Sequence, residues 1–78
     1  MRFLKVHEGF YEKLMADYPS LSPNDLRICA LLRLNLSSKD IAKILHMSSP
    51  SVNVSRSRIR KKMKMPQELN LVTFLMEY

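Results

Sequence analysis

The sequence predicts an all-α fold: a small helical bundle that contains a helix-turn-helix and carries one extra N-terminal amphipathic helix. Apolar residues recur at spacings of three and four, and no segment shows the alternation of a half-buried strand. Four prolines and three serine-led helix start signals divide the 78 residues into helical segments. A chain of this length forms one small core.

The first predicted helix covers residues 3–18 and ends before Pro19, because the residue before a proline is disfavoured in the α region. Its apolar stripe consists of Phe3, Leu4, His7, Phe10, Tyr11, Leu14, Met15 and Tyr18. We expect residues 1–19 to form an N-terminal helix that packs on a domain made by residues 20–78.

Serine-led start signals predict the next three helices. Ser22 precedes a helix over 23–34, which Asn35 can end in the left-handed conformation. Ser37 precedes a short helix that ends at residue 45 or 46, and Ser48 precedes a helix over 49–64. After Pro66, a last helix is expected over 68–77.

The two middle helices have the spacing of a helix-turn-helix, in which a short turn joins two packed helices. The residues expected to pack between them are Ile41, Ala42, Leu45, Met47, Val52, Ser55, Ile59 and Met63. The helix over about 49–64 would then be the recognition helix.

Positive charge is concentrated in the second half of the chain. The net charge is +6, and residues 36–78, with eight basic and three acidic side chains, contribute +5. Six of the nine residues in 56–64 are cationic and none is anionic. A block of like charge indicates a polyanionic partner. The alternative is a solvated helix face.

The sequence resembles the LuxR-type (GerE-like) DNA-binding domain of bacterial transcriptional regulators. The resemblance runs without a gap from Leu21 to Met65, continues through the last helix, and covers about 55 residues. It rests on Leu21-Ser22-Pro23, Asp25, Ile28-Cys29, Leu31-Leu32, Leu36-Ser37, Lys39-Asp40-Ile41-Ala42, Leu45, Met47-Ser48, Ser51-Val52, Ile59, Lys62-Met63, Leu71-Val72 and Leu75. Asn35 and Lys64 replace family glycines, so a less sharp exit is expected at Lys64, and Ser55 replaces a histidine.

The outward face of the recognition helix carries the candidate base contacts, and the resemblance points to the same four positions: Asn53, Val54, Ser57 and Arg58. Asparagine can pair with adenine, arginine with guanine, and valine can contact a thymine methyl. Alternatively, Asn53 and Val54 are ordinary surface residues. The candidate phosphate contacts are Lys39, Ser51, Arg60, Lys61, Lys62 and Lys64. The five cations among them predict a salt slope of about −4 to −5 per domain.

Three further placements follow from the same pattern. Arg56 is expected to pair with an acid such as Asp40 rather than with DNA. The apolar row Leu26, Ala30 and Leu34 needs a cover, for which the N-terminal helix is available; the alternative is that this helix serves dimerisation or acts as a linker. The resemblance implies a homodimer through the last helix, with Phe74, Leu69 and Met76 as candidates. Alternatively, Phe74 packs under the N-terminal helix.

The sequence gives no support for an enzyme, a cofactor or a metal site. His7 and His46 are far apart, the single glycine excludes a phosphate-binding glycine loop, and Cys29 lies among core residues. With no membrane span or signal peptide, we expect a cytoplasmic protein. Double-stranded DNA is the expected partner, together with RNA polymerase; a sigma-factor-like promoter reader and a basic protein-interaction module are the alternatives. The chain is either an excised effector domain or a small stand-alone regulator.

Overall fold

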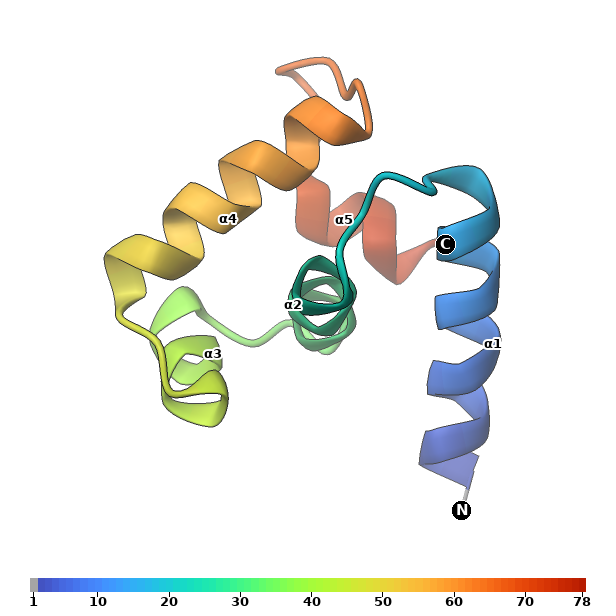
Figure 1. The fold of residues 1–78 in the computed structure, drawn as a ribbon, viewed down its shortest axis with the longest axis horizontal. Helices are drawn as coiled ribbons and strands as arrows, with labels where there is room; N and C mark the ends of the chain where they lie inside the picture. The colour runs from blue at the N-terminus through green and yellow to red at the C-terminus, as the bar shows by residue number, and fades with distance from the viewer. Residues whose placement is uncertain (1) are drawn as a thin grey trace.

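The computed structural model describes residues 2–78, with side chains described from residue 9 onward. It contains five helices in this part of the chain, α1 (Arg2–Asp17), α2 (Pro23–Arg33), α3 (Ser38–Leu45), α4 (Ser49–Lys62) and α5 (Leu71–Met76), and no strand. The all-α prediction is therefore confirmed. Helix α2 lies at the centre, with α3 and α4 on one side and α1 on the other (Figure 1).

The predicted helix starts are confirmed at the three serine caps. Ser22, Ser37 and Ser48 each accept a hydrogen bond from the backbone amide three residues later. At Ser22 the capping box is complete, because the carboxylate of Asp25 in turn accepts from the Ser22 amide. The last helix is shorter than predicted: Asn70 caps it, so it begins at Leu71 rather than at residue 68.

Left-handed residues end the three central helices. Asn35, His46 and Lys64 have φ values of 65°, 57° and 55°. After α2 and after α4, the reverse hydrogen bonds of a Schellman motif follow, such as Met65 N–H to the Arg60 carbonyl at 3.1 Å. The expectation of a less sharp exit at Lys64 is wrong, because this lysine adopts the conformation that glycine would supply. It also ends α4 at Lys62, two residues before the predicted end.

The core forms around α2, and the predicted inward stripe of α4 is confirmed. Val52, Ser55, Ile59 and Met63 are all at most 5% exposed. They meet buried residues of the other helices: Ile28, Cys29, Leu32, Ile41, Ala42, Leu71 and Leu75. Burial and the negative charge of Asp25 raise the pKa of the Cys29 thiol to about 12. The thiol therefore stays protonated and behaves as a small core group.

Helix α1 packs against α2 through one face. Phe10 and Leu14 are buried, and on α2 Leu26 and Ala30 are 8% and 3% exposed. Leu34, expected under the same cover, is 45% exposed, because α2 ends at Arg33 and the chain turns away there. The side chains of Phe3, Leu4 and His7 lie outside the described residues.

An aromatic cluster joins α1 to the end of the chain. The Tyr78 ring lies 6.0 Å from Phe10 and 5.7 Å from Phe74, between ring centroids. The Tyr78 hydroxyl donates to the Asp17 carboxylate, and the Lys13 ammonium donates to the Tyr78 carbonyl at 3.1 Å. Burial and Asp17 raise the pKa of Tyr78 above its ordinary value. Phe74 is thus half-buried in a cluster that includes α1; its role in a dimer stays a prediction.

The packing of α1 predicts unequal effects for two neighbouring side chains. Leu14 is completely buried, whereas Met15 is 46% exposed. Leu14→Ala should lower the free energy of unfolding by about 2–5 kcal/mol through lost burial and a cavity. Met15→Ala should change it by less than about 1 kcal/mol. Urea denaturation of both variants checks this; equal, small effects would show that α1 does not contribute to the core.

Candidate nucleic-acid interface

Helices α3 and α4 form two packed helices joined by the short turn 46–48. The left-handed His46 ends α3, and the Met47 amide donates to the Ala42 carbonyl at 2.8 Å. The Ser48 cap then starts α4. Ile41 of α3 is buried, as are Val52, Ser55 and Ile59 of α4, so the side of α4 opposite this buried stripe faces outward.

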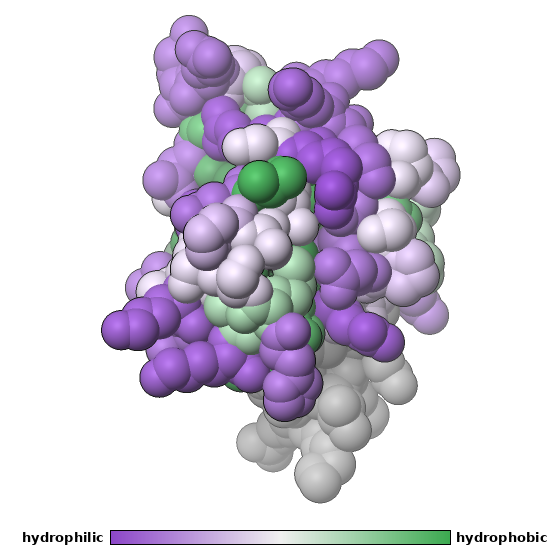
Figure 2. Space-filling view, turned by 60° about the vertical axis from the view of Figure 1, so that its left-hand side comes forward, coloured by the Kyte–Doolittle hydropathy of each residue, from purple (hydrophilic) through white to green (hydrophobic). Residues whose placement is uncertain are grey.

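The face that carries α3 and α4 is mostly hydrophilic, with a small apolar area within it (Figure 2). Val54, 64% exposed, is an apolar side chain of this face. It borders a depression of about 320 Å³ lined also by Met47, Pro50, Ser51 and Arg58. A second hollow of about 250 Å³ lies at the end of α4; its lining includes Ser57, Arg60, Lys61, Lys64 and Gln67.

The predicted DNA contacts fall into two groups by exposure. Those exposed are Lys39, Ser51, Asn53, Val54, Ser57, Arg58, Lys61 and Lys64. Arg60 and Lys62 are only partly exposed. Most of the predicted residues are therefore exposed, and the two partly exposed cations have additional neighbours.

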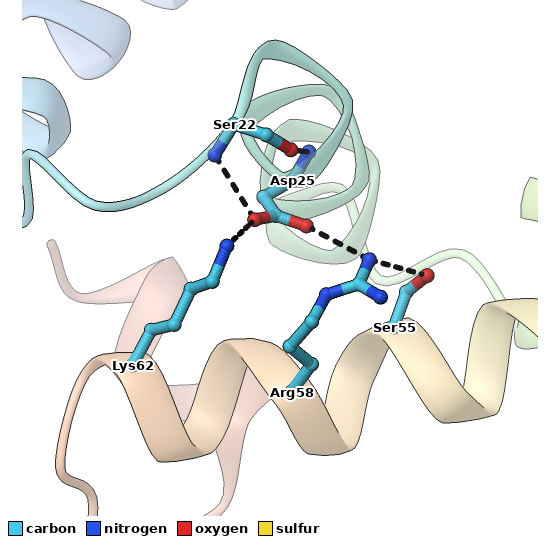
Figure 3. Close-up of polar contacts among 5 residues, drawn as sticks. All are labelled: Ser22, Asp25, Ser55, Arg58 and Lys62. Carbon is cyan, nitrogen blue, oxygen red and sulfur yellow. Dashed lines mark hydrogen bonds and ion pairs between the residues drawn. The ribbon is translucent and has the colours of Figure 1, made fainter.

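Asp25 is the buried charge of this region, and it joins α2 to α4 (Figure 3). Its carboxylate accepts from the Lys62 ammonium at 2.8 Å, from the Ser22 amide at 3.0 Å and from Arg58 Nη2 at 3.4 Å. The Asp25 side chain is 0% exposed, whereas those of Lys62 and Arg58 are 28% and 50% exposed. One buried carboxylate thus compensates two cations of the basic helix.

The surroundings of Asp25 favour its ionised form. Burial alone would raise the pKa of the carboxyl, but the hydrogen bonds from Lys62 and from Ser22 outweigh it. The pKa of Asp25 is therefore held below its ordinary value of 3.8. Since a buried charge is tolerated only when it is paired and hydrogen-bonded, this set of partners explains how an ionised aspartate fits in the core.

The same contacts orient Arg58 on the flank of α4. Its Nη2 donates to Asp25 and, at 3.3 Å, to Ser55 Oγ, whose side chain belongs to the buried stripe (Figure 3). Both hydrogen bonds are donated by Nη2, so Nη1 and Nε take no part in them. The guanidinium is partly tied to the scaffold and half exposed.

A chain of hydrogen bonds links the other flank of α4 to α3. Arg56 Nη1 donates to Ser38 Oγ at 3.0 Å, and Ser38 Oγ donates to Asn53 Oδ1 at 2.8 Å. The expected pair between Arg56 and Asp40 is wrong, because the Ser38 hydroxyl lies within reach of the guanidinium instead. Arg56 thus serves the packing of α3 on α4, and it orients the predicted base contact Asn53.

Arg60 is bound to the segment before α5. Its Nη1 donates to the Leu69 carbonyl at 2.7 Å and its Nη2 to the Pro66 carbonyl at 2.9 Å. The Pro66 carbonyl also accepts from the Leu69 amide at 3.1 Å, so Arg60 adds a second donor to that turn and a first donor to the Leu69 carbonyl. Arg60 therefore holds the 66–69 segment against the end of α4.

Residues 19–75 match the family of bacterial regulatory proteins named after LuxR (GerE), which is most of the chain. The chain belongs to the LuxR family. The match covers α2 to α5, and it confirms the resemblance seen in the sequence. This LuxR-type domain is a DNA-binding helix-turn-helix of transcriptional regulators. Comparisons with curated proteins and with solved structures give no match.

In residues 2–78, no helix is long and apolar enough to cross a membrane. Within the described residues, no group of three or more His, Cys, Asp or Glu side chains could hold a metal ion.

Sequence reasoning missed two functions of charged residues. In the sequence, Asp25 is notable only as one residue of the family resemblance, yet it also neutralises cations 33 and 37 residues later. Arg60 was expected on phosphate, yet it binds two carbonyls. No rule of sequence spacing relates positions that lie so far apart. A single acidic residue in the first turn of a central helix, in a chain that also has a strongly basic helix, is nevertheless a signal for an ion pair between the two.

The depressed pKa of Asp25 predicts a specific loss of stability in acid. A carboxyl whose folded-state pKa lies below its ordinary value stabilises the fold above that value, 3.8, and loses this contribution as the pH falls through the folded-state pKa. Asp25→Asn should lower the free energy of unfolding by about 1–3 kcal/mol at pH 7 and flatten its fall in acid. Urea denaturation between pH 7 and pH 2 measures both, with the exposed Asp40→Asn as control. A parallel pH profile in wild type and Asp25→Asn would contradict the assignment.

The Arg60 bonds predict a stability effect that other cations of α4 lack. Arg60→Ala leaves the Pro66 and Leu69 carbonyls without these donors and should cost about 1 kcal/mol. Lys61→Ala, an exposed neighbour, should be nearly neutral. Thermal denaturation compares them, and similar melting temperatures for both variants would show that the bonds do not stabilise the segment.

Proposed function

We propose that this LuxR-type domain binds double-stranded DNA sequence-specifically, with α4 as the recognition helix in the major groove. The observation that carries the proposal is the division of α4 into two faces. Its apolar stripe is fully packed on the scaffold, and the exposed face gathers polar, cationic and single apolar groups. A major groove accepts one α-helix and presents donors, acceptors and methyl groups to such a face.

Four residues of α4 are proposed to read base edges. Asn53, held at Oδ1 by Ser38, would pair with adenine, and Arg58, held at Nη2, would pair with guanine. Val54 would contact a thymine methyl from the rim of the depression that it borders. Ser57, exposed between Asn53 and Lys61, would donate or accept without strong discrimination.

Phosphate binding is assigned to the exposed candidates Lys39, Ser51, Lys61 and Lys64. Lys39 lies in the first turn of α3, where free amides and the helix dipole already favour an anion. Lys62 and Arg60 are also candidates from the sequence. In the fold, however, Asp25 binds Lys62 and two backbone carbonyls bind Arg60, and these partners compete with a phosphate for the two cations. Three free lysines predict a salt slope of about −3 per domain, shallower than the slope from five cations.

A single domain reads one half-site, so a two-fold dimer is proposed to bind the full operator. The candidates for that contact are Leu69, which lies before α5 and is 46% exposed, and Met76, the last residue of α5, which is 53% exposed; Phe74 is shared with the aromatic cluster. The partners are DNA and, through it, RNA polymerase in the bacterial cytoplasm. Stable co-purification with core polymerase would favour the sigma-factor-like alternative.

The phosphate assignment predicts how charge removal changes binding. Lys61→Ala should weaken every duplex alike and reduce the salt slope by about 1. Arg27→Ala removes the same charge from an exposed position of α2 whose neighbours include Tyr11 and Met15 of α1, and it should leave the slope unchanged. Fluorescence anisotropy with a labelled duplex at several salt concentrations measures both. No binding of any duplex at micromolar protein would overturn the proposed function in favour of a protein-interaction module.

A further inference from the structure

We infer that Asp25 determines base specificity without touching DNA, because it fixes the orientation of the Arg58 side chain from the buried side of α4. This inference rests on the proposed function, and it deepens it by naming what sets the selectivity of the α4 surface. Asp25 is completely buried, on a different helix from the base-reading residues. Its influence on DNA therefore passes through the side chains that it binds.

The geometry of Arg58 supports this positioning. Asp25 Oδ1 and Ser55 Oγ both accept from Nη2, at 3.4 and 3.3 Å, and both accepting side chains are at most 4% exposed. The two anchors are rigid because they belong to the packed interior. Arginine has five N–H donors, so Nη1 and Nε keep three for a base edge. A guanidinium held at one nitrogen presents the remaining donors in a restricted range of directions.

Pre-orientation matters for selectivity because a long arginine side chain can reach many acceptors. An unrestrained guanidinium can bind phosphates or several bases, and it loses about 2 kcal/mol of rotamer freedom when it is fixed on one. Anchoring to Asp25 and Ser55 removes part of that freedom before DNA arrives. The carboxylate also lowers the net positive charge beside the groove, which weakens binding to any sequence alike.

Two consequences of the carboxylate can therefore be separated. Its charge acts on all duplexes, whereas its bond to Arg58 acts on one base pair. Asp40 offers the matched comparison: it is an exposed acid on α3, and its removal changes the charge by the same amount without touching Arg58. Ser55 offers a second comparison, since Ser55→Ala removes one anchor with no change of charge.

The test is binding-site selection on random duplex DNA by the wild-type domain and by Arg58→Ala, followed by affinities for the selected site and its single-base variants. The base pair whose preference Arg58→Ala abolishes is the one that Arg58 reads; in the wild type, discrimination there should be about 5- to 150-fold. Asp25→Asn should reduce that ratio severalfold at this base pair alone. Ser55→Ala should reduce it less, and Asp40→Asn should leave it unchanged while tightening all sites.

The double variant Asp25→Asn/Arg58→Ala should discriminate no worse than Arg58→Ala, because both act through one contact. Binding is measured well below the melting temperature of each variant, and Ser55→Ala tests the same idea if Asp25→Asn does not fold. Three results would overturn the inference: a discrimination ratio in Asp25→Asn equal to that in Asp40→Asn, a wild-type ratio in Ser55→Ala, or no preference abolished by Arg58→Ala. If the wild-type domain still binds selectively in these cases, the proposed function stands. A wild-type domain that binds all duplexes alike, or none, overturns both.

Discussion

An ionised carboxylate without access to water has to be surrounded by donors, and the position of Asp25 obliges the start of α2 to lie beside the C-terminal half of α4. Ser22 supplies a backbone donor from the same helix, while Lys62 and Arg58 supply charge from the other. Helix α2 also contacts α1, α3 and α5. The orientation of α4 on the rest of the molecule therefore depends on one buried acid at the head of the central helix.

The cationic side chains of α4 point in different directions, and the direction of each one determines whether it binds within the fold. One flank turns Arg58 and Lys62 toward α2, and the other turns Arg60 toward the 66–69 segment and Arg56 toward α3. The face between these flanks remains open. Four of the six cations in 56–64 make contacts within the fold, and Lys61 and Lys64 are left for a polyanion. Counting cations alone overestimates how many of them are available for binding.

Local features were predictable because they depend on neighbours in the chain. The serine caps, the left-handed Asn35 and the buried stripe of α4 follow from spacing and backbone sterics. The partners of Arg56 and Arg60 were not predictable, since they depend on where α3 and the 66–69 segment lie in space. Leu34 shows the same limit: its helical row predicts burial, but its place after the last turn of α2 exposes it. That most candidate residues are exposed was predictable from the helical pattern, whereas the contacts of Asp25, Arg56 and Arg60 within the fold were not.

The left-handed residues at the ends of the helices have a consequence for how this domain tolerates mutation. His46 and Lys64 hold a conformation that costs an L-amino acid roughly 1 kcal/mol or more, in a chain whose single glycine lies elsewhere. The fold accepts this cost at two turns that frame α4. Replacement of His46 or Lys64 by glycine would therefore stabilise the fold. Such a substitution could compensate for destabilising changes on the DNA-facing surface when its base preference diverges.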